Sequence, residues 1–339
     1  MLACGLAIAM WLRLPAALEG AGLAPGIGLV AGSLLSGFLV DRRHHKAALT
    51  AGLALLSVAL WCAAAVPPSH LWMRLCSGTL GLGGGMALLA ADALIAAATS
   101  RSRAAALNLL HLMFPVGVLV NPPLSAEPLA LAAAATATLA LAFAAWTPMA
   151  LPAPAPREGG TAPVPLLALL LFLYAICEAG TWIWLARYMD AARVLDRATA
   201  WLVLSYSLPL GLIVGRIGVS RILVNVAPLP VARIASFALA FTTALMLLAR
   251  SPSASWIGGF SVGVAMAAIL PTTLAMSWDA LPRLPATGMA IVLAGGWIGL
   301  AASSPLIAGI ADRSSLPVAM LVLPVVSLAM GALTIAARR

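Results

Sequence analysis

The stretch Gly37-Phe38-Leu39-Val40-Asp41-Arg42-Arg43-His44-His45-Lys46 separates two long apolar runs of this sequence. It places an acid, two arginines, two histidines and a lysine in six consecutive positions. Charge is costly inside a bilayer, so a cluster of this kind indicates a short loop at the membrane surface. The stretch therefore predicts a membrane protein and marks one of the loops between its helices.

The composition extends this prediction to the whole chain. The 339 residues are 63% hydrophobic and only 9% charged, with a mean hydropathy of +1.06. A soluble core of this size could not hide so much apolar surface, and long Ala-, Leu- and Gly-rich runs favour helices over a barrel. We expect an all-α polytopic membrane protein with about 12 apolar segments, near residues 1–17, 22–40, 47–66, 71–98, 104–122, 127–146, 165–186, 198–215, 232–249, 254–275, 286–305 and 316–336.

A proline- and glycine-rich stretch lies between the sixth and seventh segments. Such composition is typical of a flexible linker, because proline and glycine interrupt regular helices. We therefore expect an N-terminal six-helix bundle at 1–150, a cytoplasmic linker at 151–164 and a C-terminal six-helix bundle at 165–339. The first segment is the exception: it offers only about 12 residues before Arg13 and Pro15, below the length needed to span. Helix 1 is thus expected to be shortened, either through a late start codon or in the native protein.

The charges and cysteines exclude several classes of function. The net charge of +9 could suggest a nucleic-acid partner, but the basic residues are scattered between apolar segments and follow membrane topology. Most of the 19 lysines and arginines fall on one side when both termini are cytoplasmic, which predicts a multi-pass protein of the inner (cytoplasmic) membrane. The four cysteines lie inside apolar segments without metal-ligand spacing, so we expect no metal, no disulfide framework and no cofactor.

Four stretches resemble the major facilitator superfamily. Gly37, Asp41, Arg42 and Lys46 resemble its signature loop, which lies on the cytoplasmic side between helices 2 and 3. The stretch from Arg74 to Gly85 resembles helix 4, where an arginine is followed by spaced glycines. Gly211, Gly215 and Arg216 resemble a second-half copy of the loop motif that lacks its acid, and the stretch from Pro305 to Arg313 resembles the end of helix 11. The resemblance implies two bundles that rock about a central site, a transporter rather than an enzyme, and a cytoplasmic gate that contains the loop residues, Gly215 and Arg216.

A narrower resemblance concerns helices 5 and 7. Residues 107–117 and 172–182 are similar to these helices in the branch of fucose-permease-like sugar:proton symporters, which implies coupling to protons. The middle of helix 4, residues 86–91, departs from that branch, because it is apolar where the branch often has an acid or an asparagine.

Glu178, on helix 7, is the strongest candidate for chemistry within the membrane. A buried carboxylate can bind and release a proton as access alternates, although it can also be held structurally by hydrogen bonds to a neighbouring helix. Trp182 lies one helical turn later on the same face, where a ring beside a carboxylate suits a sugar or ordinary packing. Arg13 and Arg74, on helices 1 and 4, could attract an anion or pair with Glu178, or else extend toward the headgroups.

Three further polar residues are expected near the cytoplasmic side. Asp92, near the inner end of helix 4, is predicted to pair with Arg42 or Arg43 and to latch this side closed, with contact to the substrate as the alternative. Asn108 and His111 lie in the inner half of helix 5. A histidine exposed to a cavity would titrate near neutral pH, and one bonded between helices would be structural.

The sequence has no nucleotide-binding loop of the form Gly-x-x-x-x-Gly-Lys-Ser/Thr, so ATP hydrolysis is not expected to drive it. We predict a monomeric secondary transporter of a small polar solute, coupled to protons and embedded in the lipid bilayer. Two alternatives remain open: an exporter of drugs or metabolites, and a non-transporting relative that acts as a sensor or assembly factor or is a truncated relic.

Overall fold

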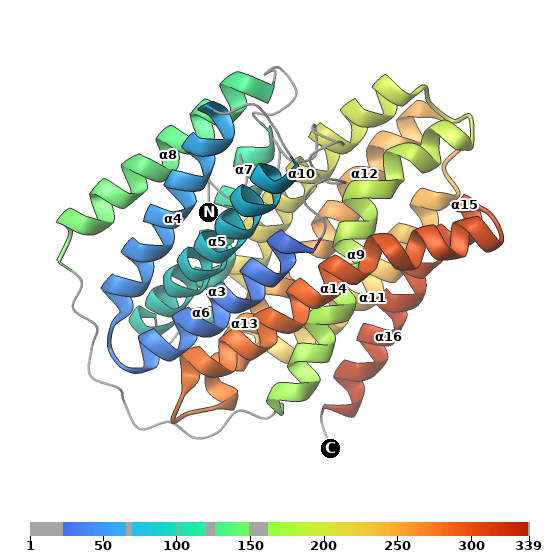
Figure 1. Cartoon of the computed structure of the whole chain (residues 1–339). Coiled ribbons are helices and arrows are strands. Elements are labelled where there is room, and N and C mark those ends of the chain that lie inside the picture. The colour runs from blue at the N-terminus through green and yellow to red at the C-terminus, as the bar shows by residue number, and fades with distance from the viewer. Residues whose placement is uncertain (1–22, 66–69, 100–101, 120–125, 149–161, 338–339) are drawn as a thin grey trace.

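The structure, a computed structural model, describes residues 23–65, 70–99, 102–119, 126–148 and 162–337. Within these ranges the regular structure is entirely helical (Figure 1). The first expected segment, with Arg13, lies outside the described residues. The helices are α3 (Ala24–Asp41), α4 (His45–Ala65), α5 (His70–Ala98), α6 (Arg103–His111), α7 (Met113–Leu119), α8 (Ala126–Trp146), α9 (Val164–Ala191), α10 (Arg197–Ile222), α11 (Pro228–Leu247), α12 (Pro252–Met266), α13 (Ile269–Ala280), α14 (Pro285–Arg313), α15 (Leu316–Met320) and α16 (Val322–Ala336).

Nine stretches of the described chain are long and apolar enough to cross a membrane. Two of them join consecutive helices, α12 with α13 and α15 with α16. Two shorter apolar stretches, Arg103–Leu119 and Ala130–Trp146, coincide with the expected fifth and sixth segments. The predicted all-α multi-pass membrane fold is therefore confirmed over the described residues, and the count of twelve helices stays a prediction.

Glycines on α5 bring the helices of the first half close together. A side chain on Gly85 would collide with the Leu29 carbonyl of α3, and one on Gly83 would lie 2.5 Å from the Leu56 nitrogen of α4. Small residues let helix backbones approach in a membrane, where packing rather than a hydrophobic force holds helices together. These glycines thus permit close approach of neighbouring helices on two sides of α5.

A proline breaks the helix that the sequence predicts as segment five. Pro115 has no N–H, so the carbonyl of His111, four residues earlier, cannot accept the usual helical hydrogen bond. The chain divides here into α6 and α7, and the Leu112 N–H donates both to the carbonyl of Asn108, its usual helical acceptor, and to that of Leu109, each at 3.2 Å. The break leaves a backbone acceptor inside an apolar region.

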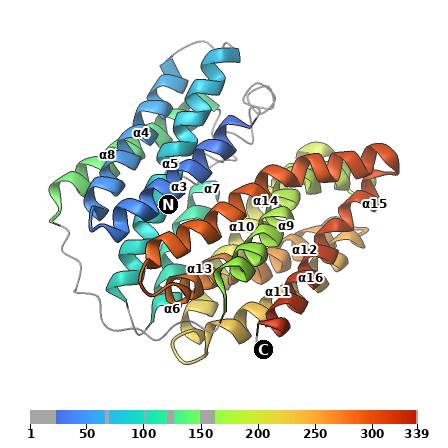
Figure 2. The same cartoon turned by 60° about the horizontal axis from the view of Figure 1, so that its bottom comes forward.

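The first-half helices (α3–α8) and the second-half helices (α9–α16) meet along two seams (Figure 2). In one seam α3 packs against α14, and in the other α6 packs against α10 and α13. The turns at 42–44 and 281–284 lie at one end of both seams, close to the contacts of Asp41 with Ala286 and of Arg103 with Asp279, and we call it the Asp41 end. The domain boundaries at 150 and 165 stay a prediction.

Candidate functional site

Asp41 caps the first turn of α14 from across the seam. Its Oδ1 accepts a hydrogen bond from the Ala286 N–H at 3.0 Å, and its Oδ2 accepts from the Thr287 N–H at 2.8 Å and from the Thr287 hydroxyl at 2.6 Å. The first N–H groups of a helix have no partner within the helix and carry partial positive charge, so a carboxylate stabilises them. Asp41 thus joins the two halves at this end.

Gly37 lies one turn before Asp41 and lets α3 touch α14. A Cβ at this position would lie 2.7 Å from the Ala290 Cβ, 2.9 Å from the Ala286 carbonyl oxygen and 3.2 Å from the Thr287 Cα. All three distances are shorter than ordinary van der Waals contact. Only glycine fits without movement of one of the two helices.

Arg42 and Lys46, the other loop residues expected in the gate, make their described contacts within the first half. The Arg42 guanidinium stacks 3.4 Å from the centroid of the Phe38 ring on its own helix. The Lys46 Nζ donates to the Thr147 carbonyl at 3.1 Å, which ties α4 to the end of α8. Both side chains therefore hold the loop rather than bridge the seam.

An ion pair that sequence reasoning missed joins α6 to α13. Arg103 Nη1 donates to both carboxylate oxygens of Asp279, at 2.6 and 2.8 Å, and its Nε donates to the Ala96 carbonyl at 2.9 Å. The Arg103 side chain is 9% exposed and that of Asp279 is 41% exposed. An acid in the last turn of a membrane helix, opposite a basic loop, was the available signal for this pair.

Asp92 does not pair with Arg42 or Arg43, so that prediction is wrong. It lies six residues before the end of α5, about 9 Å along the helix axis from its last residue at a rise of about 1.5 Å per residue. There it is fully buried, and its Oδ1 lies 2.9 Å from His111 Nε2. The histidine is thus bonded between helices, as one interpretation of the sequence expected.

Arg216 crosses the second seam and uses the acceptor that Pro115 leaves free. Its side chain is 2% exposed, and Nη1 donates to the backbone carbonyl of His111. Its Nε has no hydrogen-bond partner among the described residues. Gly215 was predicted with Arg216 as part of the cytoplasmic gate. It packs within the second half, where a Cβ at this position would lie 2.6 Å from the Ala267 Cβ.

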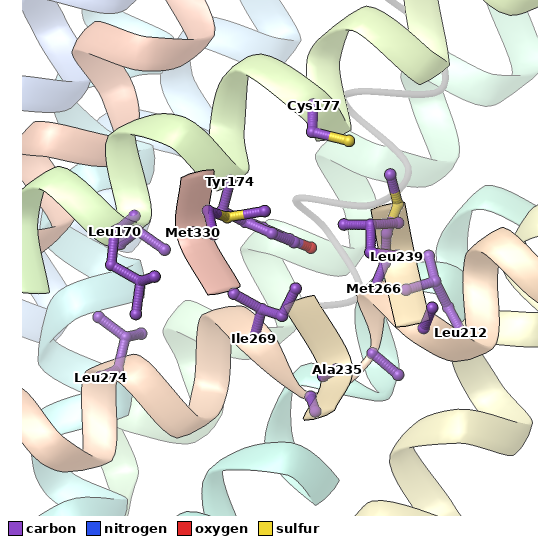
Figure 3. Close-up of a cluster of buried hydrophobic side chains, with 14 of the residues drawn as sticks. Leu170, Tyr174, Cys177, Leu212, Ala235, Leu239, Met266, Ile269, Leu274 and Met330 are labelled. Atoms are coloured by element: carbon purple, nitrogen blue, oxygen red, sulfur yellow. The ribbon is translucent and has the colours of Figure 1, made fainter. Parts of the chain in front are cut away.

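Glu178 lies near the middle of α9, half-buried, and Arg216 and Tyr174 are close enough to act on its charge. Tyr174 is one turn earlier on the same face and fully buried in the large hydrophobic cluster, with Ile269 and Met266 nearby (Figure 3). Arg74 is exposed near the start of α5, far along that helix from Asp92. Arg216 is therefore a cation that the structure describes near Glu178, and the expected roles of Arg13 and Arg74 stay predictions.

Comparison of the whole chain with known proteins gives matches in structure alone: no family model and no curated protein sequence matches it. The fucose:proton symporter FucP of E. coli superposes with a TM-score of 0.77 at 16% identity, over 100% of this chain and 95% of its own. The proton:xylose symporter XylE, a major facilitator superfamily protein, gives 0.77 at 9% identity, over 100% and 93%. The human organic anion transporter MFSD10 gives 0.77 at 16%, over 94% and 83%.

The chain has the major facilitator superfamily fold. The resemblance seen in the sequence is therefore confirmed at the level of the fold, including its similarity to a fucose:proton symporter.

Trp182 and Asn108, two more of the residues expected at the site, lie one helical turn from Glu178 and His111 respectively. Trp182 follows Glu178 by one turn, is 8% exposed, and its indole Nε1 has no hydrogen-bond partner among the described residues. Asn108 is fully buried on α6, one turn before His111; its amide nitrogen donates to the Ala104 carbonyl at 2.8 Å and its Oδ1 has no described partner. Both retain hydrogen-bonding capacity inside an otherwise apolar interior.

Proposed function

We propose that the protein is a secondary transporter of a small polar solute that works by alternating access and is coupled to protons. The observation that carries this proposal is a group of ionisable side chains on the membrane-spanning helices. Asp92, His111 and Arg216 are buried at the seam between the halves, and the half-buried Glu178 lies near Arg216 in the second half. Charges within a bilayer are costly and mark pathways for substrates or ions, so four such groups close together support transport.

The contacts at the Asp41 end support alternating access. Asp41 binds the first turn of α14, and Arg103 binds Asp279, so both bonds link one half to the other. Each is a polar contact that water can replace when the halves part. The basic residues predict that this end faces the cytoplasm, in which case the observed conformation is the one closed to the cytoplasm.

The surroundings of Glu178 favour a hydroxyl-bearing solute over an apolar drug. A carboxylate accepts hydrogen bonds, and the unpartnered indole N–H of Trp182 one turn away can donate one. A solute hydroxyl can do both at once, whereas an apolar cargo would leave these groups unsatisfied at a cost of several kcal/mol. We therefore place the solute beside Glu178 and Trp182, on the face of α9 that turns toward Arg216.

Uptake into liposomes tests the proposal. The purified protein would be supplied with labelled monosaccharides, amino acids, organic acids and lipophilic cations, with and without a proton gradient. We expect accumulation of a polar solute that stops when a protonophore collapses the gradient. Glu178→Gln should abolish uptake, because the proposed solute binds this carboxylate, and Asp190→Asn, an exposed acid on the same helix, should behave as wild type.

The other outcomes each reject part of the proposal. Accumulation by Glu178→Gln at the wild-type rate would remove this carboxylate from the mechanism. Transport of lipophilic cations alone would favour the exporter of drugs. Neither transport nor binding of any compound by a folded wild-type protein would favour the non-transporting relative.

A further inference from the structure

Asp92 and His111 form a pair whose net charge depends on one proton. Their side chains meet at 2.9 Å, and Asp92 is fully buried with its Oδ2 lacking a described hydrogen-bond partner. With a neutral imidazole the pair carries one negative charge, and with a protonated imidazole it carries none. Imidazole is the side chain whose charge ordinarily changes near neutral pH.

Other titratable and charged groups lie on the helices packed against α5 and α6. The structure describes Asp41 at the end of α3, His45, Lys46 and Cys62 of α4, Arg103 of α6, Arg197, Tyr206, Arg216 and Arg221 of α10, Asp279 of α13, and Asp312 and Arg313 of α14. Tyr174, Cys177 and Glu178 of α9 lie on the far side of Arg216 in the second half. Arg103 and Asp279 neutralise each other. Arg216 is the cation that contacts His111, through the backbone carbonyl.

Charge counting shows that this cluster lacks one positive charge. Ionised Asp92 and Glu178 supply two negative charges and Arg216 supplies one positive charge, once two compensated groups are set aside. These are the Arg103–Asp279 pair and Asp41, which binds the N–H groups at the start of α14. A buried charge without compensation is strongly unfavourable. One bound proton makes the described cluster neutral, and His111 is placed to carry it because Asp92 accepts its Nε2–H.

We propose that Asp92 and His111 form a proton-binding site and that Arg216 couples its occupancy to closure of the Asp41 end. This inference rests on the proposed transport function and names the place of the proton. Arg216 belongs to the second half, whereas Asp92 and His111 belong to the first, so their attraction exists only while the halves are together. The unprotonated pair, with one negative charge, attracts Arg216 and favours closure.

Protonation acts in the opposite direction. It cancels the negative charge of the pair, so Arg216 then binds the first half through the His111 carbonyl alone. Binding of the proton therefore favours opening of the Asp41 end, and by linkage closure of that end weakens proton binding. The proton released on closure returns to water along the side of the cluster that is open at that moment, and no other group changes its covalent bonds.

Hydrogen–deuterium exchange in lipid nanodiscs tests this coupling without any solute. The reporter is the first turn of α14, whose Ala286 and Thr287 N–H groups bind Asp41 only in the closed state. Rates are corrected for the pH dependence of chemical exchange. For the wild type we expect protection of this turn to fall about five- to 150-fold on acidification through roughly pH 8 to 5, the usual range for coupling between two sites.

Two variants should fix the protein in opposite directions. Asp92→Asn removes the negative charge that attracts Arg216, so the pair is neutral or positive at every pH and protection should be low throughout. His111→Gln keeps the negative charge of Asp92 and removes the titrating ring, so protection should be high and independent of pH. The double variant His44→Gln, His45→Gln is the control, because it removes the two imidazoles of the loop at 37–46 and leaves His111 in place. Its protection should depend on pH as that of the wild type does.

Arg216→Met should leave proton binding by Asp92 and His111 intact but remove its effect on the first turn of α14. In this variant the carboxyl and imidazole bands of Asp92 and His111 should still change with pH in infrared spectra, whereas α14 should no longer respond. A wild-type response in His111→Gln or Asp92→Asn, or its loss in the loop variant, would overturn the inference. If the wild type takes up no solute but its hydrogen–deuterium exchange depends on pH as expected, the proposed function is overturned and the proton site is not.

Discussion

Replacement of Gly37 by alanine should weaken closure of the Asp41 end, because α3 and α14 meet there without space for a side chain. The added Cβ would lie 2.7 Å from the Ala290 Cβ. Carbon atoms in contact prefer about 3.5–4.0 Å, so the two helices must separate by about 1 Å at this point. Asp41 lies one turn later, and the same shift lengthens its bonds of 3.0 and 2.8 Å to the first turn of α14.

The size of the effect follows from the cost of overpacking. Insertion of one carbon into a well-packed contact costs about 1–3 kcal/mol. Because the clash exists only while the halves touch, this cost falls on the closed state and changes the ratio of closed to open protein by about five- to 150-fold. Exchange of the Ala286 and Thr287 amides, measured in nanodiscs at fixed pH, should accelerate by the same factor.

Gly26→Ala provides a matched control on the same pair of helices. A Cβ at Gly26 would lie 3.6 Å from the Ala301 Cβ, an ordinary contact, at the far end of the seam from Gly37. This variant should leave exchange in the first turn of α14 unchanged. The reasoning fails if Gly37→Ala exchanges as the wild type does, or if both variants accelerate exchange equally.

Two further predictions concern polar bonds across the seams. Arg103→Gln should cost about 1–3 kcal/mol of stability, because Arg103 is buried and also binds the Ala96 carbonyl. Asp279→Asn should cost less than about 1 kcal/mol, because this carboxylate is partly exposed. Equal shifts in unfolding temperature for the two variants would contradict the prediction. Trp297→Phe and Ser33→Ala remove one 3.0 Å hydrogen bond between α14 and α3, so a double-mutant cycle should give a coupling of about 0.5–1.5 kcal/mol, and strict additivity would show that the bond contributes nothing.

The helices were predictable from the sequence because a membrane span has a required length and an apolar composition. The gate role of Gly37 and Asp41 stays a prediction, and their place beside the second half fits it, although the partner of Asp41 was not predictable. That partner is the pair of backbone N–H groups at the start of α14, and backbone groups carry no residue letter that a motif could show. The search for a side-chain partner led to Asp92, which the register of α5 directs toward His111 instead.

The position of Arg216 was predictable in part. Its motif was visible, but its contact depends on a tertiary arrangement that brings α10 beside the break between α6 and α7. One local signal existed: Pro115 follows His111 by four residues, so the His111 carbonyl must find a partner outside its helix. Which helix supplies that partner is decided by packing of the two halves, and no pattern within one segment contains that information.

Two of the contacts between the halves satisfy backbone groups that one half leaves free, which bears on how the fold can have two states. Asp41 satisfies N–H groups that α14 leaves free at its start, and Arg216 satisfies a carbonyl that Pro115 leaves free in the first half. An unsatisfied backbone group in a bilayer costs several kcal/mol, so each half carries groups that demand a partner. When the halves meet, the other half of the protein supplies this partner; when they part, water entering between them can supply it instead.

An entirely apolar seam would favour the closed state alone, because opening would expose apolar surface to water without compensation. Polar bonds to free backbone groups make both states acceptable, and a small change in charge, such as one proton on His111, is then sufficient to choose between them.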